Sequence, residues 1–276
     1  MSWHGRLALN YRHADARTTV RDRHDGPLRV LQSLYPEGPA ICHNVLVHPP
    51  GGVVGGDVLE VDIALGEDAH ALVTTAGATR FYRSAGGWAS QTTTARLAPN
   101  SRLEWLPLET IAFDGCRAEG SIRFELSAGA QMIGWDLLAL GLPASNQPFA
   151  RGTYRQSIEW PGRWLERGTI AADDHRLLDS PLGLAGHRTL GTLWFTSGTP
   201  LTDARREALL ESARAIARDH ALAKRAGATS PHDDVVVLRV LAPAVEPALG
   251  LLSSVWRAWR WGAWGLEAVA PRVWRT

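Results

Sequence analysis

The sequence has few cysteines, no excess of basic residues and no long apolar run, and each absence excludes a class of protein. Only Cys42 and Cys116 occur in 276 residues, so a disulfide framework is not expected and a reducing compartment is favoured. The formal net charge is +1 and no Lys/Arg run stands out, which disfavours a nucleic-acid groove. There is no apolar run of about 18 residues to cross a bilayer, nor a signal-peptide core at the first residues. We therefore expect a cytoplasmic protein that binds neither nucleic acid nor membrane.

Short catalytic motifs are also missing. The chain has no Gly-x-Ser-x-Gly elbow, no His-Glu-x-x-His and no Cys-x-x-Cys. A Cys/His/Asp set can be assembled on paper from Cys42 or Cys116, but any chain of this length offers one. Two alternatives stay open: a β-helical hydrolase or lyase acting on a glycan or peptide, whose stacking surfaces would come from the 12 tryptophans, and an interaction module built on the Trp-rich C-terminus.

The most unusual stretch runs from His48 to Asp57. It contains two prolines, two Gly-Gly pairs and one aspartate, between strand-like segments at 41–47 and 58–65. Proline stiffens the entry, and the glycines allow positive φ and close backbone approach. No Gly-Lys-Ser/Thr follows and the next element is a strand, so this is not a phosphate-binding loop. The alternatives are a functional loop around Asp57 or a tight turn of a β protein.

Alternating residues and a weak internal repeat predict a mainly β fold. Residues 58–65 alternate apolar and polar side chains, as a strand with one buried face does. Three segments share a strand, a turn after a leucine and a second strand. The turn leucines are Leu65, Leu97 and Leu126, at spacings of 32 and 29 residues. Such a period favours stacked β-strand layers, either helicoidal or in a large sandwich.

Helical patterns are confined to the C-terminal third. Thr202 is a credible N-cap for an amphipathic helix that we expect Gly227 to end. A Val-rich strand follows at 234–241, and Pro247 opens a second helix. We expect a single domain over 1–276, with a β-rich body to about residue 200 and a helix–strand–helix addition over about 201–276. The segment 74–84 mixes hydroxyls, aromatics and arginines, so it either contacts a partner or an anion or forms a solvated β-hairpin arm, and we expect the arm.

Several of these motifs together resemble the UreD family of urease accessory proteins, called UreH in some bacteria. The matching motifs span almost the whole chain: Tyr35-Pro36-Glu37, Cys42-His43, the loop His48 to Asp57, Thr74 to Ser84, Leu103 to Pro107, Trp135 to Leu138, Leu140-Gly141 and Pro271 to Thr276. The chain departs from the family pattern at Leu142, where arginine is usual, and at Asn146-Gln147, where the family has Gly-Glu.

The resemblance implies a non-enzymatic role in nickel delivery. Family members form a complex with a helical accessory protein and a nickel-carrying GTPase, and this complex docks on apo-urease. Nickel is thought to pass through a water-filled passage in the UreD-type subunit. The family fold is β-rich and helicoidal, with two helices near the C-terminus. No permanently bound cofactor is implied, only transient Ni²⁺.

Transfer requires weak, exchangeable ligands, because a closed site of soft ligands would hold nickel too tightly to release it. Carboxylates inside the protein also lower the cost of moving a cation through a low-dielectric interior. The predicted nickel contacts are therefore Asp57, Glu37 and Glu166, with Asp136 and Glu109 behind them. His43 and His48 are the possible imidazole ligands. For each residue the alternative is a hydrogen-bonded structural role.

Overall fold

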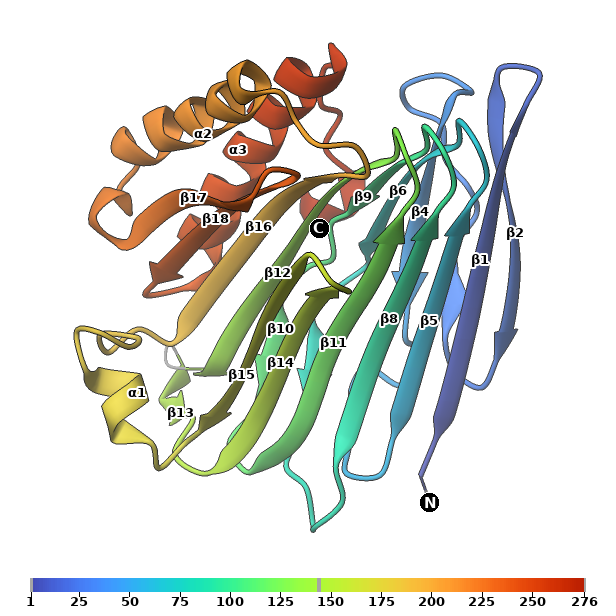
Figure 1. The fold of residues 1–276 in the computed structure, drawn as a ribbon. Helices are drawn as coiled ribbons and strands as arrows, with labels where there is room; N and C mark the ends of the chain where they lie inside the picture. Colours follow the sequence, from blue (N-terminus) through green and yellow to red (C-terminus); the bar gives the residue numbers. More distant parts are fainter. Residues whose placement is uncertain (1, 143–144, 276) are drawn as a thin grey trace.

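Two packed β-sheets form most of the molecule, and the computed structural model describes residues 2–142 and 145–275 (Figure 1). Sheet A has seven strands in the order β15-β14-β11-β8-β5-β1-β2. Its strands are β1 (His4–Ala14), β2 (Arg17–Asp25), β5 (Val58–Leu65), β8 (Ala89–Leu97), β11 (Cys116–Leu126), β14 (Gly152–Trp160) and β15 (Trp164–Ala171).

Sheet B has eleven strands, eight of them in the path β17-β18-β16-β12-β9-β6-β4-β3. These are β3 (Arg29–Val30), β4 (Ile41–Val47), β6 (His70–Thr75), β9 (Arg102–Trp105), β12 (Gln131–Leu142), β16 (Thr189–Ser197), β17 (Ala226–His232) and β18 (Val235–Ala242). The short strands β7 (Thr79–Phe81), β10 (Thr110–Ala112) and β13 (Gln147–Pro148) complete it.

The chain coils between the sheets, and each coil adds one parallel strand to each of them. From β4 to β14 the longer strands fall alternately in sheet B and sheet A, with β5, β8, β11 and β14 parallel in one and β4, β6, β9 and β12 parallel in the other. Leu65 pairs with Leu97 and Leu97 with Leu126, so the three repeat leucines lie in one row. The predicted mainly β, stacked-layer fold and its repeat are confirmed.

The turns after these leucines stack in the same way. Asp68, Asn100 and Gly129 occupy equivalent places and all have positive φ, at 58°, 59° and 74°. The Asp68 N–H donates to the Pro99 carbonyl, and the Asn100 N–H donates to the Ala128 carbonyl. Asn, Asp and Gly tolerate this left-handed conformation, which explains why the leucine is followed by these residue types.

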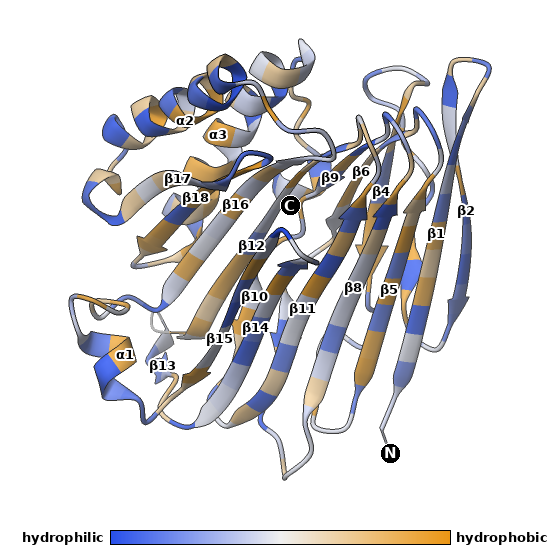
Figure 2. Cartoon of the chain, in the orientation of Figure 1, coloured by the Kyte–Doolittle hydropathy of each residue, from blue (hydrophilic) through white to orange (hydrophobic). Residues whose placement is uncertain are grey.

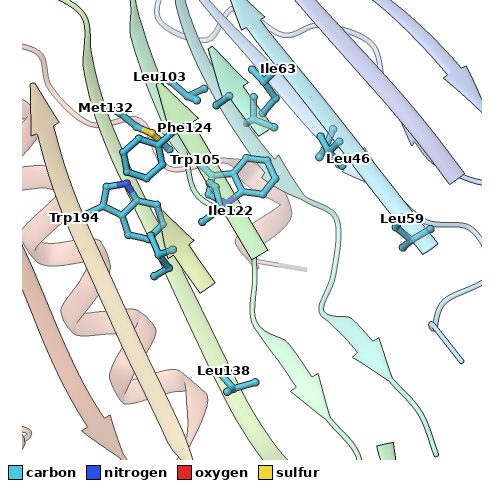
Figure 3. Packing of buried hydrophobic residues seen from close by; sticks show 14 of the residues in the cluster. Leu46, Leu59, Ile63, Leu103, Trp105, Ile122, Phe124, Met132, Leu138 and Trp194 are labelled. Atoms are coloured by element: carbon cyan, nitrogen blue, oxygen red, sulfur yellow. The ribbon is translucent and has the colours of Figure 1, made fainter. Parts of the chain in front are cut away.

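The main core lies between the sheets. Leu59, Val61, Ile63 and Leu65 face it from β5, whereas Glu60 and Asp62 point to the other face, as the alternation predicts. Figure 2 shows the corresponding alternation of hydropathy along the strands of sheet A. Aromatic side chains fill the wide part of the core: Phe124 stacks on Trp194 with ring centroids 6.0 Å apart, and Figure 3 shows Met132 and Trp105 beside them.

Helices cover the other face of sheet B (Figure 1). The long helices are α2 (Asp203–Arg218) and α3 (Val245–Trp264), and a short helix α1 (His175–Asp179) precedes β16. The apolar faces of α2 and α3 form a second core with Leu72, Ile133 and Trp135 of sheet B. The two predicted helices near the C-terminus are thus confirmed. Within residues 2–142 and 145–275 no helix is long and apolar enough to cross a membrane.

Two details of the predicted secondary structure are wrong. The helix capped by Thr202 ends at Arg218 rather than at Gly227, and Gly227 lies within β17. Its last turn is closed by the Asp219 N–H, which donates to the Ala215 carbonyl, so no glycine is needed there. Residues 74–84 do not form a hairpin arm, because β7 pairs in parallel with β10 as part of sheet B.

Candidate functional site

A polar cavity interrupts the apolar core between the two sheets. It has a volume of about 40 Å³, and Asp136 of β12 and Gln156 of β14 line it from opposite sheets. The Gln156 amide donates to the Asp136 carboxylate. The other polar side chains of the lining include threonine, tyrosine and glutamine, and apolar side chains such as those of Phe81, Trp105 and Ile122 line the rest. These polar residues are Thr79, Thr93, Thr110, Tyr154 and Gln91. We call this space the central cavity.

Burial raises the pKa of Asp136 to about 6, even though the hydrogen bond from Gln156 acts in the opposite direction. The nearby Glu166 carboxylate raises it further. No arginine, lysine or histidine side chain within the described ranges pairs with Asp136. The carboxylate therefore faces a space that suits either a proton or a cation.

A row of polar side chains continues from Asp136 across sheet B. Asp136 pairs in register with Thr192 of β16, and Thr192 pairs with Arg239 of β18. Glu166 of β15 completes the row from sheet A, because Arg239 Nη2 donates to Glu166 Oε2 at 2.7 Å and the Arg239 Nε lies 3.0 Å from Oε1. Arg239 is half exposed, so this end of the polar row reaches solvent.

A larger pocket adjoins the central cavity on its other side. Its volume is about 340 Å³, and it shares Thr79 and Gln91 with the central cavity. His48, Gly51 and Gly52 line it from the glycine-rich loop. Burial lowers the pKa of His48, although the Asp57 charge acts to raise it, so this imidazole is neutral at pH 7 and available as a ligand. We call this space the loop-end pocket.

The Asp57 side chain stabilises the glycine-rich loop through hydrogen bonds to backbone N–H groups. Its carboxylate accepts hydrogen bonds from the Trp3 N–H at 2.8 Å and the Val54 N–H at 2.9 Å, and its side chain is buried. The Asp57 N–H donates back to the Val54 carbonyl, which closes a tight turn through Gly55 and Gly56. A Cβ at Gly55 would lie 2.2 Å from Ser84 Oγ, so the neighbouring loop requires glycine there.

Glu37 and His43 meet on the opposite face of sheet B, under helix α3. Their side chains are 2.7 Å apart, and the other Glu37 oxygen pairs with Arg260 of α3. Arg260 also pairs with Glu104 of β9, which accepts hydrogen bonds from His70 at 2.8 Å and from Trp256 at 2.7 Å. The five charged and imidazole side chains form one chain of contacts, the α3 network: His43, Glu37, Arg260, Glu104 and His70.

Ionisation in the α3 network follows from burial and pairing. Burial alone disfavours a charged Glu104, but its bonds to His70 and Trp256 and the Arg260 charge lower its pKa overall. Burial lowers the pKa of His70, which therefore stays neutral against Glu104. The network thus places paired charges between α3 and sheet B.

The predicted nickel contacts therefore occupy three places. Glu37 and His43 belong to the α3 network, Asp57 and His48 to the glycine-rich loop, and Glu166 to the polar row. Glu109 immediately precedes β10, and its carbonyl accepts from the Thr79 N–H. Across the residues that the structure describes, no three His, Cys, Asp or Glu side chains are grouped so as to hold a metal ion.

The cysteines do not form a nucleophile. Burial raises the pKa of Cys116 to about 12 and also raises that of Cys42, so both thiols stay protonated. The Cys42 thiol donates to Asn44. These observations lend no support to the Cys/His/Asp alternative.

The sequence did not predict which side chains bond the predicted acids Asp136, Glu166 and Glu37. Gln156, Thr192 and Arg239 are polar residues in strands, and nothing local distinguishes them from solvent-facing ones. Arg260 lies four residues from Trp256 and is fully buried. The only signal for it was an arginine among tryptophans on the face of a helix that the pattern assigns to the core.

Comparison with known proteins agrees with the motifs. The family model described as UreD urease accessory protein matches residues 4–275. Proteins named urease accessory protein UreD from Variovorax paradoxus (strain S110) and Leptothrix cholodnii (strain ATCC 51168 / LMG 8142 / SP-6) are each 63% identical to this chain, over 276 and 278 residues and over all of both chains. One from Polaromonas naphthalenivorans (strain CJ2) is 55% identical over 99% of each chain. The chain belongs to the UreD family of urease accessory proteins.

Proposed function

We propose that this chain is a cytoplasmic, non-catalytic scaffold that delivers nickel during urease maturation. In this proposal it links a nickel-carrying GTPase and a helical accessory protein to apo-urease, and Ni²⁺ crosses the molecule as cargo. The observation that carries the proposal is the Asp136 carboxylate in the central cavity, which has a hydrogen-bond donor but, among the residues that the structure describes, no countercharge.

The proposed route runs between the two sheets. It joins the polar row ending at Glu166 and Arg239, the central cavity at Asp136 and the loop-end pocket at His48. Threonine and glutamine oxygens lie between the acids, as weak ligands that exchange a hydrated cation readily. Asp136 supplies one carboxylate in the central cavity and His48 supplies an imidazole in the loop-end pocket, so each space offers few strong ligands, which suits transfer better than storage.

The other predicted contacts take different roles in this proposal. Glu37, His43 and Asp57 already have hydrogen-bonding partners in the protein, so we assign them to holding α3 and the glycine-rich loop. Direct nickel contact by these three residues stays a prediction of the family resemblance. His48 and Glu166 border the proposed route and are retained as transient contacts.

Replacing Asp136 by asparagine tests the route. The side chain keeps its shape and its capacity to accept from Gln156, but it loses the charge that attracts a cation. We expect at least a tenfold lower urease activity and nickel content when urease is co-expressed with the variant, with co-purification of the assembly unchanged. Nickel is measured by mass spectrometry on purified urease.

Asp62→Asn is the matched control, because Asp62 lies half exposed on the outer face of sheet A and forms an ion pair with Arg96 at 4.0 Å. It should activate urease like the unmodified chain. Equal nickel loading with Asp136→Asn would show that the central cavity does not carry nickel, and failure of the unmodified chain to co-purify with any urease component would contradict the scaffold role.

A further inference from the structure

Four loops stack at the end of the β-sheets that carries the glycine-rich stretch. Backbone hydrogen bonds connect them in series: the Tyr82 N–H donates to Val53, the Ser84 N–H to Gly115, and the Gly115 N–H to Arg151. The loops are 48–57, 82–88, 113–115 and 149–151, and they succeed one another as the coils do (Figure 1). The resulting surface is rigid, because each loop braces the next.

Exposed apolar side chains gather on this surface. Trp3 is 55% exposed, Val54 41% and Tyr82 36%. Tyr82 lies over Gly52, where a Cβ would come within 2.0 Å of its ring, and it packs on Phe113 with ring centroids 4.7 Å apart. Trp3 and Val54 are held by the Asp57 carboxylate through their backbone N–H groups. The buried Asp57 carboxylate thus fixes the backbone at two exposed apolar residues, Trp3 and Val54. Exposure to water does not stabilise their side chains.

The same surface is positively charged. Arg80 and Arg83 are exposed, and neither has an ion-pair partner among the described residues. Arg117 and Arg155 lie against the Trp88 ring, the latter with its guanidinium 3.9 Å from the ring centroid. Both acids of these loops are occupied, because Asp57 accepts from backbone N–H groups and Asp114 is paired with Arg151. Exposed aromatic residues surrounded by arginines are the composition of interaction hot spots.

We propose that this surface, the loop face formed by Trp3, Val54, Tyr82, Arg80 and Arg83, docks an acidic protein surface of the urease maturation assembly. The partner presents an apolar centre ringed by aspartate and glutamate, which complements the aromatic centre and the unpaired arginines. The choice of assembly rests on the proposed function; the docking surface itself does not require nickel transfer.

Docking here also bears on the loop-end pocket, which Arg80 lines together with His48. Before docking, the Arg80 charge repels a hydrated cation at this opening. An acidic partner neutralises that charge and closes the opening to solvent, so a cation in the pocket exchanges with the partner rather than with water.

The test uses the full chain with two double variants and separately purified apo-urease, helical accessory protein and GTPase. Arg80→Glu/Arg83→Glu reverses the charge, and Trp3→Ala/Tyr82→Ala removes the aromatic centre. Affinity is measured by biolayer interferometry at 50 and 300 mM NaCl. We expect each double variant to bind at least one component tenfold or more weakly than the unmodified chain, with the charge effect shrinking at high salt.

The control is Arg257→Glu/Trp261→Ala, which removes one exposed arginine and one 61% exposed tryptophan on α3, in the helical layer far from the loop face (Figure 1). Circular dichroism and thermal unfolding check that every variant folds. Unchanged affinity of both loop-face variants for all three proteins overturns the proposal, as does an equal loss in the control. The nickel route can fail independently, since Asp136→Asn leaves the loop face intact.

Discussion

Two groups of buried acids lie on opposite faces of sheet B, and they differ in what surrounds them. On the face under α3, Glu37 and Glu104 share Arg260 and have a histidine each. On the inner face, Asp136 has one amide donor and a cavity in front of it. In the first group, histidine, arginine and tryptophan side chains already bond the carboxylate oxygens. In the second, the Asp136 carboxylate faces a cavity that leaves room for an ion.

The comparison teaches that burial of an acid does not by itself indicate a functional site. Glu104 of the first group and Asp136 look alike in sequence, since each lies between apolar residues of a strand. The two groups differ in whether a positively charged side chain pairs with the carboxylates. Arg260 does so for Glu37 and Glu104, whereas Asp136 is bonded by the neutral Gln156 amide. Paired buried charges are costly to break, whereas an unpaired carboxylate destabilises the fold and is retained where it has another use.

Removing the shared cation of the α3 network should have the largest effect on stability. Arg260→Met leaves Glu37 and Glu104 buried without a countercharge, so we expect a loss of about 3–5 kcal/mol in the free energy of unfolding. Urea unfolding followed by circular dichroism measures it. Arg257→Met, one turn earlier on the exposed side of α3, should change stability by less than about 0.5 kcal/mol. Similar values for the two variants would show that the network does not anchor α3.

Neutralising the acid of the central cavity should act in the opposite direction. The pKa of Asp136 is higher in the folded protein, about 6, than its usual 3.8, so the folded state binds the proton more tightly. The ionised form therefore costs stability above pH 6, and this cost disappears as the pH falls toward 4. Asp136→Asn should stabilise the protein by up to about 3 kcal/mol at pH 8, the equivalent of roughly two pKa units.

Urea unfolding in the presence of a chelator checks this sign. The stability difference between Asp136→Asn and the unmodified chain should shrink as the pH is lowered from 8 to 5. Asp62→Asn, on the solvated face of sheet A, should show no such trend. A destabilised Asp136→Asn at pH 8 would mean that the carboxylate has a countercharge in solution.

The bridge between the two sheets at the end of the polar row should have the smallest effect. Glu166 and Arg239 are 25% and 46% exposed at their side chains, and solvent screens pairs of this kind. Arg239→Gln should therefore cost less than about 1 kcal/mol, and less still at 0.5 M NaCl. Thermal unfolding at two salt concentrations measures this cost. A loss above about 2 kcal/mol in the free energy of unfolding would show that this exposed pair stabilises the fold as a buried ion pair does.

Much of the fold could be predicted from the sequence because it depends on local patterns. Alternation placed β5 and its buried face, and the leucine-turn repeat predicted the row of Leu65, Leu97 and Leu126. Thr202 marked the start of α2, since its hydroxyl accepts from the Arg205 N–H. The helix end was missed because backbone bonds, rather than glycine, close the last turn.

The candidate site was predicted in part. The acids Asp57, Glu37, Glu166 and Asp136 were recognised as unusual in their surroundings, and His43 and His48 as possible ligands. Their grouping was not predictable, because the strands that bring Asp136 to Gln156 and Glu166 to Arg239 belong to different sheets. Cross-sheet contacts depend on how the coils stack, which no single segment encodes.

The glycine-rich loop shows most clearly what the sequence determines and what the tertiary structure determines. The sequence by itself determined that residues 48–57 form a stiff entry and a turn that only glycine permits, because backbone sterics are local. Only the tertiary structure decided that Asp57 faces the Trp3 and Val54 N–H groups and that an unpaired carboxylate lies instead at Asp136. Whether a buried acid is paired depends on residues far away in the chain, and packing alone brings them within hydrogen-bonding distance.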